Sequence, residues 1–136
     1  MDFIAPSCDS NLGVIINNVQ LSNVLQKQEL KSIRKLWVNH GVAIFPKQNL
    51  NLQEYENFSA QFGPFGDEPF LIPMQEHPHI VKLHRKPDEE AAHFGGAWHS
   101  DWSFQSAPPS ATILYAEIIP PMGGDTLFAN TANAYD

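Results

Sequence analysis

Apolar residues at helical spacing predict a helix over 26–40. Leu30, Ile33 and Trp37 fall on one face of this segment, and its lysines fall elsewhere. Gly41 follows the last helical position, where a left-handed C-cap favours glycine. We therefore expect an amphipathic helix that ends at Gly41 and buries one face against a sheet.

A second helix is predicted to begin at Asn51. The asparagine side chain can cap a helix, and Glu54 three residues later completes the pattern of a capping box. Tyr55 and Phe58 contribute to its apolar face. The Gly63-Pro64 pair breaks the pattern, so the helix should end before it.

Short apolar runs bounded by turn residues predict the strands. The order along the chain is two helices first, then strands joined by tight turns, with one more helix at the end. This order predicts an α+β domain whose sheets are only partly present. The expected strands are 12–19, 42–45, 79–83, 111–119 and 125–129, the turn is 120–124, and the last helix is 130–136.

Composition excludes several classes of function. The chain has 136 residues, which suits one domain, and a formal net charge of −7 with only eight basic residues, which argues against nucleic-acid binding. No apolar run approaches the roughly 20 residues of a membrane span. The N-terminus lacks the pattern of a signal peptide, and Cys8 is the single cysteine, so no internal disulfide can form. We expect a cytoplasmic protein.

The stretch AWHSDWSF carries the candidate chemistry. If it is a strand, His99 and Asp101 project to the same side, because side chains alternate along a strand. One imidazole and one carboxylate are two ligands of the two-histidine, one-carboxylate triad that holds non-haem Fe(II). Alone, the pattern is a weak signal, and in most proteins it marks a hydrogen-bonded pair at a strand end.

The surrounding segments make the pattern specific. GGAWHSDWSF, then PPSATILYAEIIPPMGGDTLFAN, then AYD resembles the TauD/TfdA family of Fe(II)- and 2-oxoglutarate-dependent dioxygenases. The earlier segments HGVAIFPKQNL and QFGPFG are also similar to the family. The resemblance covers nearly the whole chain and is strongest from Gly95 onward.

The resemblance implies a site and a fold. His99 and Asp101 correspond to two iron ligands, and Thr126 corresponds to the threonine that hydrogen-bonds a carboxylate of 2-oxoglutarate. The family fold is a double-stranded β-helix, a jelly roll of about eight strands. We expect this jelly roll, flanked by N-terminal helices, to be incomplete in this chain, because only about half of its strands are predicted.

Three further residues are candidates for the substrate pocket. Trp98 and Phe104 flank the iron-ligand motif and are expected to wall the pocket, although core packing accounts for them equally well. His93 lies six residues before His99 in a polar, glycine-rich segment and is expected to touch the substrate.

Two family residues have no counterpart in this sequence. The triad needs a second histidine downstream, and 2-oxoglutarate needs an arginine whose planar fork pairs with its distal carboxylate. The arginines are Arg34 and Arg85 only, and both precede the motif. We therefore expect residues 1–136 to be the N-terminal portion of a single dioxygenase domain, inactive alone, with the missing residues beyond Asp136.

For a complete enzyme, the resemblance implies hydroxylation of a small, anionic organic substrate. Molecular oxygen is consumed, and 2-oxoglutarate is converted to succinate and carbon dioxide. A homo-oligomer is possible. Two other hypotheses stay open: another divalent-metal enzyme on a β-barrel, and a non-catalytic half-domain that dimerises through 111–119.

Overall fold

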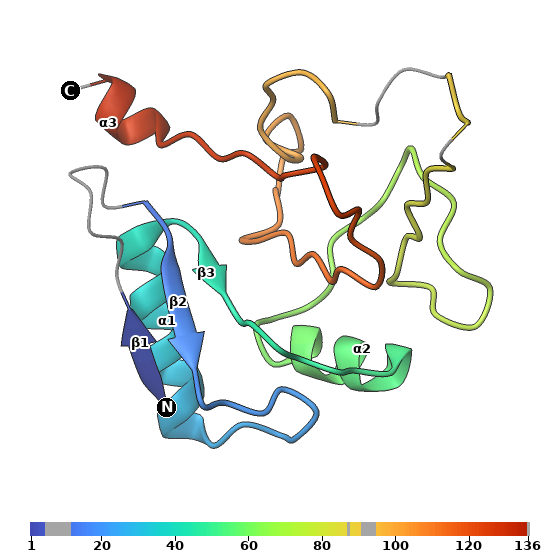
Figure 1. Cartoon of the computed structure of the whole chain (residues 1–136). Coiled ribbons are helices and arrows are strands. Elements are labelled where there is room, and N and C mark those ends of the chain that lie inside the picture. The colour runs from blue at the N-terminus through green and yellow to red at the C-terminus, as the bar shows by residue number, and fades with distance from the viewer. Residues whose placement is uncertain (5–11, 87, 91–94, 136) are drawn as a thin grey trace. The chain divides into compact units, whose positions relative to one another are not determined.

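The computed structural model describes residues 1–4, 12–86, 88–90 and 95–135. These residues form two compact units. One unit comprises 1–62 and 115–136, and the other comprises 63–114. Figure 1 shows that the helices and strands belong to the first unit, while the second is built from loops.

A small mixed sheet organises the first unit. Its strands are β1 (Asp2–Ile4), β2 (Val14–Asn17) and β3 (Ala43–Ile44), in the order β1-β2-β3. β1 pairs antiparallel with β2, whereas β2 and β3 are parallel. A parallel pair needs a crossover connection, which here is the helix α1 (Lys27–His40). The sequence predicted β2 and β3, at twice their observed length, and missed β1.

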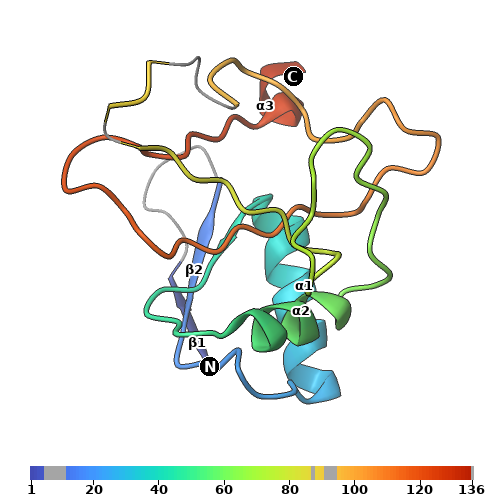
Figure 2. The same ribbon diagram turned by 90° about the vertical axis from the view of Figure 1, so that its right-hand side faces the viewer.

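The helix α1 lies on one face of this sheet and contacts β2 and β3 (Figure 2). Ile33 is 1% exposed, and it shares the core with Val14 and Ile16 of β2. At its end, Gly41 adopts a φ of 70° and donates its backbone N–H to the Trp37 carbonyl at 2.7 Å. The predicted helix and its glycine cap are confirmed.

The predicted second helix is α2 (Leu52–Ala60). The Asn51 side chain accepts the Glu54 backbone N–H at 2.9 Å, and the Glu54 carboxylate accepts the Asn51 backbone N–H at 2.8 Å. This reciprocal capping box fixes where the helix begins. Phe58, which is 3% exposed, packs edge-on against Phe45 and Phe62 and anchors the helix in the core.

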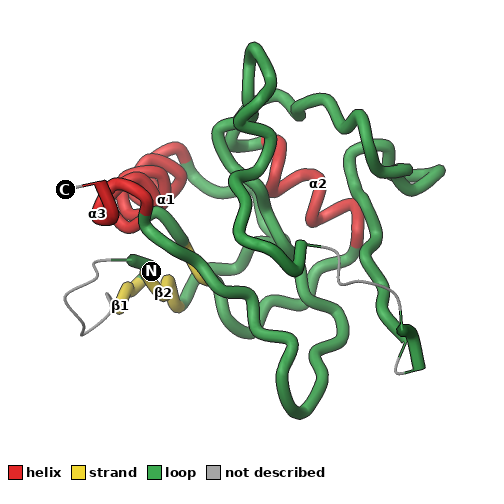
Figure 3. Tube along the Cα trace, turned by 90° about the horizontal axis from the view of Figure 1, so that it is seen from above, coloured by secondary structure: helices red, strands yellow, loops and turns green. Residues whose placement is uncertain are grey.

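The end of the chain forms a helix but no strands. α3 (Thr131–Tyr135) confirms the predicted last helix, although none of its residues is buried. Residues 115–130 return to the first unit, where the Tyr115 hydroxyl accepts the backbone N–H of Leu50 at 3.0 Å. Figure 3 shows 115–130 as loop throughout.

The second unit, 63–114, contains no helix or strand among its described residues. A turn from Met74 to Ile80 is closed by an isolated bridge between Met74 and His77, and the Met74 backbone N–H bonds to the Ile80 carbonyl at 2.8 Å. Ile80 is the one buried apolar side chain found among the described residues of this unit. The unit therefore depends on local turns and ring contacts rather than on a core.

Three predicted strands are wrong: 79–83, 111–119 and 125–129 are not strands in the structure. An extended segment becomes a strand only where a neighbouring strand pairs with it in a continuous ladder, and the described residues place no such ladder beside these segments. The α+β class agrees with the small sheet and its helices. The jelly roll stays a prediction. No helix in the described part of the chain is long and apolar enough to cross a membrane.

Candidate metal-binding site

His99 and Asp101 lie side by side in the second unit. The imidazole Nε2 is 3.1 Å from the Asp101 Oδ1, and the two side chains are 55% and 45% exposed. The segment that carries them is a series of bends and turns rather than a strand. The predicted strand was therefore wrong, but the side chains it placed together do meet.

A second contact fixes the orientation of the imidazole. The Nδ1 of His99 is 2.8 Å from the backbone carbonyl oxygen of Ala97. A carbonyl oxygen can only accept, so Nδ1 carries the proton in this hydrogen bond. In the neutral ring the other nitrogen, Nε2, then holds a lone pair. Histidines that bind metals are commonly oriented in this way, by a backbone carbonyl on the far nitrogen.

A proton or a metal ion can join the two side chains. The Nε2 lone pair and the Asp101 carboxylate both present electron density, and they repel each other unless a proton or a metal ion lies between them. Two ligands about 2.1 Å from one ion, at a right angle, are about 3 Å apart. The observed 3.1 Å fits a shared divalent ion as well as it fits a hydrogen bond.

The described residues supply two candidate ligands and no complete cluster. No group of three or more histidine, cysteine, aspartate or glutamate side chains gathers within the described ranges. His93, the nearest histidine before the pair in the sequence, lies outside the described residues. Nitrogen and carboxylate oxygen suit Fe(II) and other first-row ions, and half-exposed ligands leave room for further ones.

Thr126 belongs to the first unit, on an exposed segment after a glycine turn. Gly123 and Gly124 both have positive φ, 72° and 76°, which confirms the predicted turn. A Cβ at Gly124 would lie 2.9 Å from the Pro120 ring, so no larger residue fits without movement. The turn thus fixes where the Thr126 segment starts.

The predicted pocket residues differ in their surroundings. Trp98 is 71% exposed. Phe104 is 65% exposed and lines a cavity of about 390 Å³, together with Asp67, Pro69 and 105–107. Water reaches both side chains, so a dry pocket is not formed by these residues alone. Their role as pocket walls stays a prediction.

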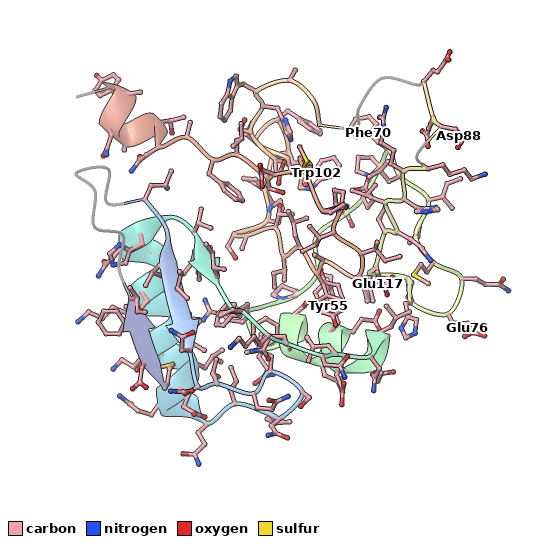
Figure 4. The ribbon with its side chains drawn as sticks, viewed as in Figure 1. Tyr55, Phe70, Glu76, Asp88, Trp102 and Glu117 are labelled. Atoms are coloured by element: carbon pink, nitrogen blue, oxygen red, sulfur yellow. The ribbon has the colours of Figure 1, made fainter. Side chains whose placement is uncertain are left out.

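Sequence reasoning missed Phe70. Its ring stacks on Trp102, with centroids 5.9 Å apart and planes inclined by 15°, and it also contacts Phe104 at 5.8 Å. Figure 4 labels Phe70 and Trp102. The two residues are 32 positions apart in irregular chain, where no periodicity predicts a contact.

Comparisons with known proteins give one consistent family. The family model described as taurine catabolism dioxygenase TauD, TfdA family matches residues 5–136. The match includes the His99–Asp101 pair and Thr126.

Curated relatives carry related names. The chain is 32% identical to an alpha-ketoglutarate-dependent sulfate ester dioxygenase from Pseudomonas putida, over 91% of this chain and 40% of that protein. It is 33% identical to an alpha-ketoglutarate-dependent sulfonate dioxygenase from Saccharomyces cerevisiae, over 92% of this chain and 32% of that protein. It is 26% identical to an (S)-phenoxypropionate/alpha-ketoglutarate-dioxygenase from Sphingobium herbicidovorans, over 98% and 46%. The chain therefore spans less than half the length of these relatives.

A solved structure is also similar. A crystal structure from Burkholderia xenovorans, assigned as an alpha-ketoglutarate-dependent taurine dioxygenase, superposes with a TM-score of 0.52 at 25% identity. The superposition covers 62% of this chain and 32% of that one.

Proposed function

Because the chain belongs to the taurine catabolism dioxygenase TauD, TfdA family, we propose that it forms part of an Fe(II)- and 2-oxoglutarate-dependent dioxygenase. The observation that carries this proposal is the His99–Asp101 pair, whose Nε2 and Oδ1 are 3.1 Å apart. The hydrogen bond from Nδ1 to the Ala97 carbonyl leaves Nε2 of the neutral ring, on the side of the carboxylate, available to bind a metal ion.

His99 and Asp101 would hold Fe(II) as one nitrogen and one oxygen ligand. Bound iron supplies the oxygen-activating chemistry that protein side chains cannot perform. The imidazole and the carboxylate would hold the ion, the Ala97 carbonyl would keep the imidazole in one tautomer, and the carboxylate would neutralise part of the metal charge. A further histidine ligand must come from outside the described residues.

The proposed cosubstrate is 2-oxoglutarate, and Thr126 is proposed to hydrogen-bond one of its carboxylates. Support for this role comes from the motif Gly123-Gly124-Asp125-Thr126 within the matched family region. Neither Arg34 nor Arg85 stands where the family places its carboxylate-binding arginine. This part of the cosubstrate site is therefore assigned to residues outside this sequence.

The proposed substrate is a small organic anion, such as a sulfonate, a sulfate ester or an aryloxy acid. The relatives' names support these classes. The segment before the motif offers few cations, namely Lys82, Arg85 and Lys86. Trp98, Phe104 and His93 are proposed to contact the substrate, with His93 outside the described residues.

The remaining proposals concern the whole protein. We propose that residues 1–136 are the N-terminal portion of one dioxygenase domain with a jelly-roll fold, because the chain spans less than half the length of its relatives. A cytoplasmic location, molecular oxygen as the co-reactant and a homo-oligomer are proposed with it. The net charge of −7 supports the absence of a nucleic-acid partner.

Succinate formation tests the function. A longer protein that contains residues 1–136 together with the proposed further histidine and arginine is incubated in air with Fe(II), ascorbate, 2-oxoglutarate and one sulfonate, sulfate ester or aryloxy acid at a time, and succinate is measured by mass spectrometry. The expected result is succinate that depends on Fe(II) and disappears in His99→Ala and Asp101→Ala. Succinate formation that is unchanged in both variants contradicts the proposal. So does an absence of succinate from protein shown to bind both Fe(II) and 2-oxoglutarate.

A further inference from the structure

The backbone next to the metal-binding carboxylate is strained. Trp102 directly follows Asp101, and its φ is 52°, in the left-handed region. A bulky residue without glycine's freedom rarely adopts this conformation, and it persists only where the surroundings hold it. The question is which contacts hold Trp102 there.

Three aromatic rings provide the contacts. Trp102 stacks on Phe70 at 5.9 Å and meets Phe104 edge-on at 5.9 Å, while Phe70 and Phe104 are 5.8 Å apart. Trp102 is partly buried by these contacts, but Phe70 is 70% exposed and Phe104 is 65% exposed. Burial in a core therefore does not explain why the three rings are together.

Hydrogen bonds tie the same two segments together. The Gln105 side-chain amide donates to the backbone carbonyl of Asp67 at 3.1 Å, and the Gln105 backbone N–H donates to the Trp102 carbonyl at 3.0 Å. The Ser100 and Ser103 hydroxyls are 2.6 Å apart across the turn. Residues 67–70 thus contact the 99–105 turn through both ring stacking and hydrogen bonds.

We propose that Phe70 is a positioning residue whose ring, stacked on Trp102, holds the turn that sets the Asp101 carboxylate against His99. This inference rests on the proposed metal-binding function of the pair. The φ of Trp102 is a rotation about its N–Cα bond, so a change in it turns the chain after Trp102 relative to the chain before it. If Trp102 relaxed to negative φ, Ser103 would move away from Ser100, and the 2.6 Å hydroxyl contact that holds the residue between His99 and Asp101 would be lost.

The effect on metal binding should resemble that of residues that orient ligands, which is typically a 10- to 100-fold loss of affinity. Phe70→Ala removes the stack. Phe70→Tyr keeps an aromatic ring and should restore it. Ile72→Ala is the matched control, because Ile72 lies in the same segment, is 90% exposed and takes no part in the ring cluster.

Trp102→Asn separates ring contact from backbone conformation. Asparagine adopts positive φ more readily than other non-glycine residues, but it cannot stack on Phe70. If the stack is what positions Asp101, this variant should weaken metal binding like Phe70→Ala. The far-ultraviolet circular dichroism of each variant, to which α1 and α2 contribute most of the helical signal, tests whether the first unit stays folded.

The experiment measures the dissociation constant of the full chain for Co(II), by visible absorption, and the imidazole ¹⁵N shifts of His99 without metal. The expected result is about tenfold weaker Co(II) binding in Phe70→Ala and Trp102→Asn. Phe70→Tyr and Ile72→Ala should match the wild type. The His99 shifts should change in the first two variants only.

Two outcomes separate this inference from the proposed function. If His99→Ala abolishes Co(II) binding but Phe70→Ala matches Ile72→Ala, Phe70 is not a positioning residue and the metal site stands. If the wild type binds no Co(II), the proposed metal site is wrong, and the ¹⁵N shifts of His99 without metal test whether Phe70 positions the pair. Identical His99 shifts in Phe70→Ala and Ile72→Ala then show that Phe70 is not a positioning residue.

Discussion

Ile33 should be a main source of stability in the first unit. It is 1% exposed on the face of α1 that lies against β2 and β3. Ile33→Ala removes three buried carbons, which at about 0.8 kcal/mol each is about 2.4 kcal/mol of transfer free energy. The cavity left behind raises the expected loss to about 3–4 kcal/mol, within the usual range for such substitutions.

Urea denaturation followed by far-ultraviolet circular dichroism measures this loss. Ile33→Val should cost about 1 kcal/mol. Val38→Ala is the control on the same helix, because Val38 is 72% exposed, and alanine's better helix propensity makes this change neutral within about 0.5 kcal/mol. Equal midpoints for Ile33→Ala and Val38→Ala would refute the packing of α1 on the sheet.

Three other predictions concern the same unit. Burial raises the pKa of the half-buried Tyr55 phenol above its ordinary value of 10.0. The unfolded chain therefore loses this proton at lower pH than the folded one, and the stability present below about pH 10 is lost as the pH rises through the folded pKa. In urea melts at a series of pH values, Tyr55→Phe should reduce the loss of unfolding free energy above about pH 10. The same slope of unfolding free energy against pH in the variant and the wild type would contradict the raised pKa. Asn51→Ala should cost about 1 kcal/mol in thermal or urea melts, because it removes the helix cap, whereas the exposed Asn39→Ala should cost less than half of that. Gly41→Ala should cost about 1–2 kcal/mol in the same melts, because a φ of 70° strains alanine, and a neutral result would contradict the glycine cap.

The helices could be predicted because their signals are local. The capping box at Asn51 and the apolar face around Ile33 lie within a few turns of chain, so neighbouring residues determine the outcome. The strand β1 was missed because its pairing with β2 joins Phe3 to Ile16, across a stretch that no short pattern spans. Residues 111–119 were predicted as a strand and are not one, because a strand-like pattern in one segment does not supply a partner strand.

The candidate site was partly predictable for a similar reason. The spacing of His99 and Asp101 placed both side chains together, although irregular chain rather than a strand brings them to 3.1 Å. The Ala97 carbonyl that fixes the imidazole could not be foreseen, because any residue supplies a carbonyl. The stack of Phe70 on Trp102 depends on tertiary structure alone.

The central claim is that His99 and Asp101 bind a divalent metal ion. Anaerobic titration of the full chain with Fe(II) in a calorimeter tests it most directly, with His99→Ala, Asp101→Ala and the exposed control His84→Ala measured alongside. We expect one bound Fe(II) per chain in the wild type and in His84→Ala, and at least tenfold weaker binding in His99→Ala and Asp101→Ala. Equal affinity in all four proteins, or no binding by the wild type, would contradict it.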